Sequence, residues 1–87
     1  MTDEIDRKTR ETARKLFDGG IKMDPPYLLW KAFDRELAKE FSRFITGNLY
    51  SREVLTLPER QMVACTALAA LRAHGELKLH VNAALNV

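Results

Sequence analysis

The last third of the chain constrains the fold more than any other segment. Residues 55–86 run LTLPERQMVACTALAALRAHGELKLHVNAALN, with few polar residues in the middle. This pattern predicts a helical hairpin, with one helix over residues 57–73 and a second over residues 76–87. His74 and Gly75 are predicted to make the tight turn between the two helices.

The first helix of this hairpin is apolar on every side beyond its capped start. Thr56 and Glu59 have the spacing of a capping box. Between Met62 and Leu71 only Thr66 is polar. A helix that is apolar all round must be buried all round, and a chain of 87 residues can hardly surround one helix completely. The sequence therefore predicts a homo-oligomer, in which a second copy covers the remaining apolar surface.

A helix is also predicted at the N-terminal end of the chain. It is capped by Thr2 or Asp3, has acidic residues in its first turn, and ends at about Phe17. Gly19 and Gly20 follow and stop it. Its apolar positions are few, so we expect it to dock only through its C-terminal end.

The next predicted helix is amphipathic and follows two prolines. Asp24 is its expected N-cap, and apolar residues recur every three or four positions over residues 29–45. Gly47 and Asn48 form its expected end, and a break or bend near Asp34 is an open alternative. No segment alternates with period two, so the fold class predicted for the whole chain is all-α, in a single domain.

Composition excludes several classes of protein. The 14 basic and 12 acidic residues are intermixed, so no basic patch indicates a nucleic-acid partner. The single cysteine allows no intrachain disulfide and favours a reducing compartment. The longest apolar run, residues 62–71, is roughly half as long as a membrane span, and the charged N-terminus has no signal-peptide pattern. We therefore expect a cytoplasmic protein with no membrane partner.

His80 stands alone in the apolar part of the last predicted helix. Lys78, Asn82 and Asn86 are spaced by four and form a narrow polar stripe, and His80 lies on the opposite side of the helix. His80 is therefore predicted to face inward. It is either a hydrogen-bonded core histidine or a buried acid or base whose proton affinity is tuned by its neighbours.

Two charged residues lie where they can act with His80. Arg60 is near the start of an apolar helix, where a cation opposes the helix dipole, so it either pairs with a carboxylate or reaches for an external anion. Glu76 precedes His80 by one turn and can orient its imidazole.

The other chemically interesting residues have plain structural interpretations. Cys65 lies among apolar residues that do not stabilise a thiolate, which favours a small buried hydrophobe. His74 and His80 are not part of a cluster with metal-ligand spacing, so no metal site is predicted. Trp30 and Tyr50 either line a pocket or belong to the core.

The hairpin segment LPERQMVACTALAALRAHGELKLHVNAALN resembles the carboxymuconolactone decarboxylase family, within the alkylhydroperoxidase-like superfamily. The preceding FSRFITGNLYSREVLTLPERQ also fits that family's glycine, aromatic residue and arginine before the hairpin. The resemblance covers roughly residues 37–87. It implies an alkylhydroperoxidase-like helical hairpin in a homo-oligomer, commonly a trimer or hexamer.

The resemblance also distinguishes two branches of chemistry. The peroxidase branch has a glutamate, a Cys-x-x-Cys pair and a histidine. In this register the cysteine positions hold Ala73 and Glu76, the glutamate position falls near Gln61, and the histidine is His80. The decarboxylase branch lacks the cysteines and keeps the arginine and histidine, which correspond here to Arg60 and His80.

The implied activity is cofactor-free decarboxylation of a small anionic substrate, a carboxylated unsaturated lactone of the 4-carboxymuconolactone type from aromatic catabolism. Arg60 would anchor the anion, His80 would return a proton to carbon, and Glu76 would orient His80. Trp30, Tyr50 and Gln61 are the expected substrate-binding residues.

Two other functions are weighed beside this one. The first is a non-catalytic helical module that uses the hairpin for oligomerisation. The second is an alkylhydroperoxidase-like antioxidant protein acting through Cys65, a residue out of register with both family cysteines. The resemblance further implies a C-terminal helix and tail beyond Asn86, which residues 1–87 do not include.

Overall fold

The computed structural model describes residues 4–52 and 54–87, and 78% of these residues are helical. The elements in chain order are α1 (Glu4–Phe17), α2 (Pro26–Phe33), α3 (Arg35–Ser42), the π-helix η1 (Arg43–Tyr50), α4 (Leu57–Ala70) and α5 (His74–Asn86). The described residues contain no strand, and Asp18 and Lys22 form an isolated bridge. The all-α prediction is confirmed. Within those residues no helix is long and apolar enough to cross a bilayer.

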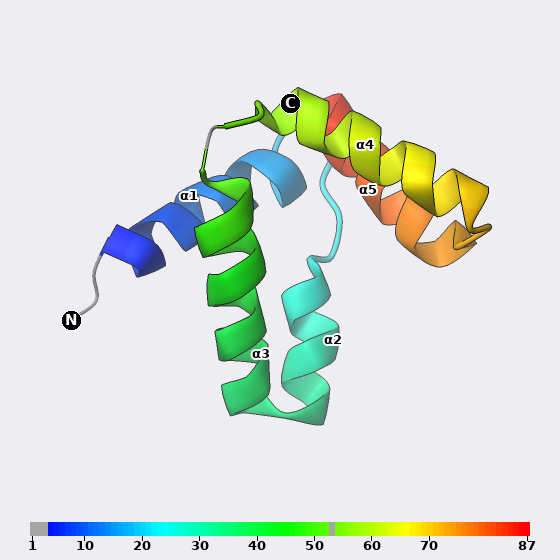
Figure 1. Ribbon diagram of the computed structural model, residues 1–87. Helices are drawn as coiled ribbons and strands as arrows, with labels where there is room; N and C mark the ends of the chain where they lie inside the picture. The colour runs from blue at the N-terminus through cyan, green and yellow to red at the C-terminus, as the bar shows by residue number, and fades with distance from the viewer. Residues whose placement is uncertain (1–3, 53) are drawn as a thin grey trace.

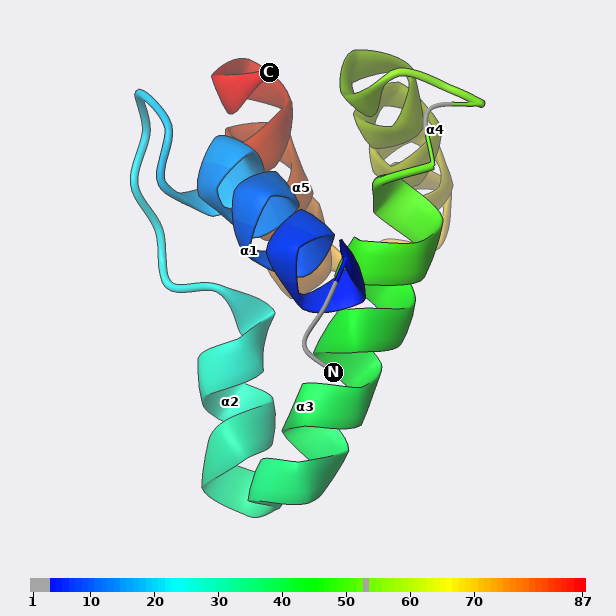
Figure 2. The same cartoon turned by 90° about the vertical axis from the view of Figure 1, so that its left-hand side faces the viewer.

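Two helical hairpins are joined by α1. Helices α2 and α3 lie side by side and extend away from the rest of the chain, while α4 and α5 form the second pair (Figure 1). α3 continues into η1, and α1 packs against both η1 and α5 (Figure 2). α1 is therefore the element that holds the two hairpins together.

The predicted amphipathic helix is divided at Asp34. This residue has an extended backbone, with φ −158° and ψ 116°, and its carboxylate accepts a hydrogen bond from Leu37 N at 3.0 Å. The chain reverses there rather than bending slightly. Pro25, not Asp24, is the N-cap of α2, because Pro25 holds the extended conformation before Pro26.

The end of this segment also differs from the prediction. Helical structure continues through Gly47 and Asn48 to Tyr50, as the π-helix η1. Asn48 donates through Nδ2 to Arg43 O at 3.2 Å, so a side chain stabilises the wider helical turn. The common glycine stop of a helix uses a left-handed backbone, and Gly47 does not form one, because no described glycine has a positive φ.

The α4–α5 hairpin has the predicted start and a different turn. Thr56 and Glu59 form the capping box that their spacing predicts. α4 ends at Ala70, three residues early, because Arg72 adopts a left-handed conformation with φ 58°. The amides of Arg72 and Ala73 donate to the oxygens of Ala69 and Leu68, which is the Schellman pattern. His74 and Gly75, expected in the turn, are instead the first residues of α5.

The C-terminal end of α5 is attached to the loop after α1. Asn86 Nδ2 donates to Leu16 O at 2.7 Å and to Ile21 O at 2.6 Å, and Asn86 Oδ1 accepts from Ile21 N at 2.5 Å. A Cβ at Gly19 would stand 3.0 Å from this side chain. The Asn86 amide therefore couples the second hairpin to α1 through short, specific contacts.

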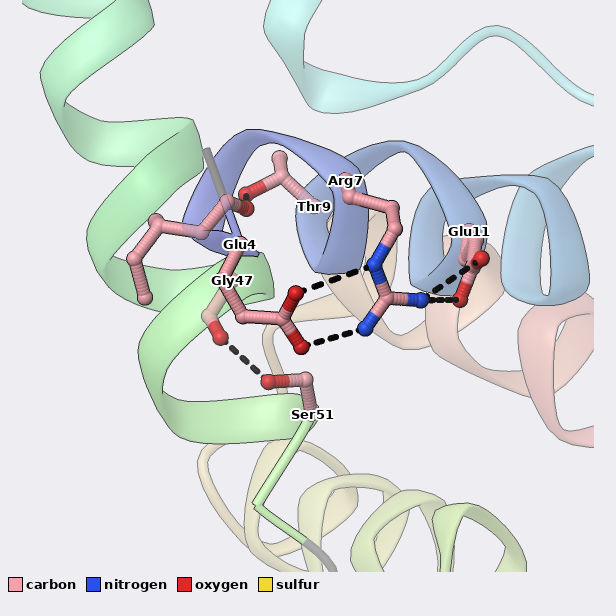
Figure 3. A network of polar contacts seen from close by, with 7 residues as sticks. Glu4, Arg7, Thr9, Glu11, Gly47 and Ser51 are labelled. Atoms are coloured by element: carbon pink, nitrogen blue, oxygen red, sulfur yellow. Dashed lines mark hydrogen bonds and ion pairs between the residues drawn. The ribbon is translucent and has the colours of Figure 1, made fainter. Parts of the chain in front are cut away.

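α1 crosses η1 at Gly47, where the two backbones approach closely. The Thr9 hydroxyl donates to Ile5 O at 2.6 Å and lies where a Gly47 side chain would be. Ser51 closes the last turn of η1 by donating to Gly47 O (Figure 3). On α1, Arg7 forms ion pairs with Glu4 and Glu11 (Figure 3). Gly47 is required here for space, not for an unusual φ.

Gly47→Ala is expected to lower the free energy of unfolding by about 1–3 kcal/mol, because the added methyl group would overlap Thr9. Urea unfolding followed by circular dichroism measures this change. Gly75→Ala is the matched control, since nothing lies within 4 Å of its added Cβ. The control should raise the free energy of unfolding by up to about 1 kcal/mol. Equal effects of the two substitutions would contradict the proposed crossing.

Candidate functional site

A pocket of about 170 Å³ lies where α1, α2, η1 and α5 meet. Its lining is mainly apolar, and the aromatic members are Phe17, Tyr27, Trp30 and Tyr50. Glu76 and His80 are the ionisable members on α5. The volume is below the roughly 300 Å³ at which drug-sized pockets begin, so it suits a single-ring molecule. Among the described residues, no arginine or lysine lines it.

His80 is the central polar residue of this pocket. Its side chain is 17% exposed, in agreement with the predicted inward orientation. Nδ1 lies 2.8 Å from Gln61 Oε1, and Nε2 lies 3.9 Å from Glu76 Oε2. The imidazole is thus held from one side by α4 and faces a carboxylate on the other.

The environment of His80 favours a neutral ring. Burial lowers the pKa of His80 below its ordinary value, and the Glu76 carboxylate partly opposes this. A lowered pKa means that the unfolded chain binds the proton more tightly than the folded chain. The neutral ring therefore contributes stability above the ordinary histidine pKa, and this contribution is lost as the pH falls through the lower, folded-state value.

Gln61, on α4, is not among the residues that line the pocket, but it contacts His80, which lines it. Its side chain is completely buried, and Oε1 is paired with His80. Nε2 is buried and makes no hydrogen bond within the described part of the chain. The sequence singled out Gln61 only through the family register. The sequence signal for a contact with His80 was that Gln61 is a polar residue at the start of an apolar helix that pairs with the helix of His80.

Tyr50 lies beside the same amide at the end of η1. Burial raises the pKa of the Tyr50 hydroxyl, while the Gln61 side chain and the nearby Arg60 charge oppose that shift. Trp30 packs edge-on against Phe41, with ring centroids 5.5 Å apart and an interplanar angle of 77°. These two expected pocket residues therefore join Glu76 and His80 at one site.

Arg60 and Cys65 lie outside this pocket. The Arg60 guanidinium donates through Nε to Leu55 O at 3.3 Å, and its charge acts on Tyr50. Cys65 is a free, partly exposed thiol on α4. No group of three or more histidine, cysteine or acidic residues forms a metal-binding cluster in residues 4–52 and 54–87.

α1 and the proline segment also contribute to this site, which the sequence pattern did not predict. Phe17, Pro25, Pro26 and Tyr27 all line the pocket. The sequence predicted that the C-terminal end of the first helix, which includes Phe17, packs against the rest of the chain and that the prolines start the next helix. Neither pattern shows that these residues line the same pocket. The only sequence signal for their contribution was an aromatic residue on each side of the loop that contains the glycines and prolines, Phe17 before it and Tyr27 after it.

Comparisons with protein-family models, with curated proteins and with solved structures found no match for this chain.

Glu76→Gln is expected to lower the pKa of His80 further, because it removes the charge that favours the imidazolium. An NMR titration of the His80 ring protons measures the shift. Glu59→Gln is the control, since glutamine also completes a capping box and Glu59 lies in the exposed start of α4. An unchanged or higher His80 pKa in Glu76→Gln would contradict the proposed pairing.

Proposed function

We propose that this chain is a cofactor-free decarboxylase of the carboxymuconolactone type, acting in a homo-oligomer, commonly a trimer or hexamer in that family. One observation carries the proposal. A partly buried histidine, held at Nδ1 by a fully buried glutamine, lines a small aromatic pocket beside a carboxylate. Such a constellation suits proton transfer to a small ring.

The reaction requires little from the protein beyond binding and proton transfer. The bond between the substrate carboxylate and the ring breaks, carbon dioxide leaves, and the electron pair moves toward the lactone carbonyl. A proton then adds to the ring carbon. The apolar lining favours this step, because it keeps water from the localised carboxylate charge, whereas the developing dienolate spreads its charge over several atoms.

His80 supplies the proton in this scheme. The ring is neutral in the free pocket because burial lowers its pKa. A bound substrate carboxylate adds a negative charge beside that of Glu76 and raises the pKa of His80. The imidazole then takes up a proton from solvent as the substrate binds, donates it to the ring carbon, and returns to the neutral form.

The proposed anion anchor acts indirectly. Arg60 does not line the pocket, but its positive charge acts on Tyr50, which does. A nearby cation makes the Tyr50 hydroxyl a better donor to an oxyanion. Tyr50 is therefore proposed to donate to the developing lactone oxyanion, with Arg60 as its electrostatic support.

Oligomer formation is supported by the apolar surface of the second hairpin. Met62 is 68% exposed, Val63 62% and Leu71 75%. These residues lie in the apolar segment 62–71, which the sequence predicts to be covered by another subunit. They equally support the second candidate function, a non-catalytic oligomerisation module. A peroxidase acting through Cys65 has less support, because the thiol lies outside the pocket.

His80→Gln should reduce kcat for 4-carboxymuconolactone decarboxylation by at least about 100-fold, because a general acid is removed. Carbon dioxide release and loss of substrate absorbance provide two independent readouts. His74→Gln, at an exposed histidine on the same helix, is the matched control and should retain full activity. A His80→Gln protein with the normal rate would refute the catalytic role, and a correctly assembled but inactive wild type would favour the oligomerisation module.

Met62→Glu is expected to convert the oligomer to a smaller species, because it places a charge in the proposed subunit interface. Light scattering coupled to size-exclusion chromatography measures the mass in solution. Lys39→Glu, on the exposed side of α3, is the control and should leave the mass unchanged. A monomeric wild type, or an unaltered mass in Met62→Glu, would exclude α4 as the interface.

A further inference from the structure

The α2–α3 hairpin presents a second apolar surface to solvent, apart from the pocket. The hairpin extends away from the rest of the chain, with its two helices side by side (Figure 1). Four exposed apolar residues of the hairpin and the start of η1 form this surface, called here the arm face: Leu29, Phe33, Leu37 and Phe44. Soluble monomers seldom expose so many large apolar side chains together, so the arm face indicates a surface that another molecule covers.

Helical geometry places the arm face on the side of the hairpin opposite the pocket. Trp30 on α2 meets Phe41 on α3, with ring centroids 5.5 Å apart, and this contact lies between the two helices. Tyr27 and Ser42 line the pocket on one side of the contact. At about 100° per residue, the arm-face residues of both helices turn to the other side. The hairpin is therefore apolar on two sides, and only the pocket side packs against the rest of the chain.

The arm face is large enough for one protein interface. Leu29 is 77% exposed, Phe33 84% and Phe44 57%. With ordinary side-chain areas, the whole face presents about 500 Å² of apolar surface. A specific interface buries about 800 Å² on each partner, of which roughly 56–65% is apolar. The arm face by itself meets this requirement.

α4 has an exposed apolar face of a different shape. The residues of this α4 face are Met62, Val63, Thr66, Ala67 and Ala70, all exposed and on the side of α4 away from buried Gln61. Most of them are small, whereas the arm face consists of leucine and phenylalanine side chains. Bulky side chains pack closely over small ones, so the two faces complement each other better than either complements itself.

The charges at the borders of the two faces favour the same pairing. Glu36 and Glu40 border the arm face on α3, and Arg72 stands at the C-terminal end of the α4 face. Glu59, at the other end of α4, is hydrogen-bonded in the capping box. Two arm faces in contact would gather four carboxylates at one interface, whereas an arm face on an α4 face brings Glu36 and Glu40 toward Arg72.

We propose that the arm face of one copy packs on the α4 face of the next copy, head to tail. A contact between two different surfaces of the same chain closes into a ring when the rotation between copies permits, which is compatible with a trimer. This contact rests on the homo-oligomer of the proposed function and is independent of its decarboxylation. It names the surface that covers α4.

The test is complementation between two variants of the full chain. Phe33→Glu places a charge in the arm face alone, and Met62→Glu places one in the α4 face alone, so each variant should be monomeric. A one-to-one mixture should give a species of twice the monomer mass and nothing larger, because one intact arm face then meets one intact α4 face. Light scattering coupled to size-exclusion chromatography measures these masses. Lys39→Glu, on α3 but outside the arm face, is the control and should keep the mass of the wild type.

The alternatives give different masses. Either variant remaining a dimer by itself would mean that identical faces pair, and would overturn the proposal. Two folded monomeric variants that do not combine would overturn it as well. Circular dichroism checks folding, and Leu29→Glu or Val63→Glu replaces a variant that unfolds, since each lies on the same face as the residue it replaces.

Other occupants of the arm face have their own outcomes. A monomeric wild type would overturn the proposal, and cosedimentation of that monomer with phosphatidylcholine vesicles would assign the arm face to a lipid surface instead. An active wild-type oligomer whose variants fail to combine would overturn this contact and leave the decarboxylase. Complementation in a chain without decarboxylase activity would confirm the contact and refute the proposed reaction alone.

Discussion

The close packing of α1 against two helical hairpins is the constraint on which the structure depends. α1 contacts η1 at one end and α5 at the other, and Leu16 on this helix is fully buried. Asp6 and Arg43 add an ion pair across the first contact, with Oδ1 and Nε 3.0 Å apart. Because the pocket is formed where α1, α2, η1 and α5 meet, its shape depends on this same packing.

A second feature of the fold is the small size of its core. Among the described residues, only Leu16, Ala38 and Ala83 are fully buried hydrophobic residues, whereas many large apolar side chains remain exposed. A chain of 87 residues gains little from such a core and usually needs further stabilisation. Burial between subunits would provide it, and it would act on the α4–α5 hairpin that also holds Gln61 and His80. Assembly and the proposed chemistry would then depend on the same two helices.

The electrostatics of the site follow from where the charges are placed. The pocket has one carboxylate and no described cation in its lining, and Arg60 acts on it only through Tyr50. A neutral His80 fits this arrangement better than a charged one, since burial disfavours the imidazolium. The buried amide of Gln61 on α4 lies within hydrogen-bond distance of Nδ1 of this ring on α5, so two helices together fix the position of the imidazole.

Local chemistry was sufficient to predict several features from the sequence alone. Helical periodicity indicated the all-α class, the Thr56–Glu59 spacing indicated the start of α4, and the polar stripe on α5 indicated that His80 faces inward. Each of these depends on residues within a few positions of one another, so the sequence contains the information directly. The spacing of Glu76 and His80 predicted that these two residues lie together, whereas a shared site with Trp30 and Tyr50 was only an expectation.

Tertiary structure decided the rest, because those features depend on contacts between distant segments. The packing of neighbouring helices sets the reversal at Asp34 and the left-handed conformation of Arg72. The sequence pattern predicted the turn between α4 and α5 at Gly75, whereas the structure has it at Arg72. The position of Arg60 outside the pocket, and the entry of Phe17 into it, depend on the angle between α1 and the hairpins. The sequence by itself determined which segments are helical and which side of α5 is buried. The three-dimensional packing decided which of those side chains share a site, since no local pattern encodes a distance across 19 residues of chain.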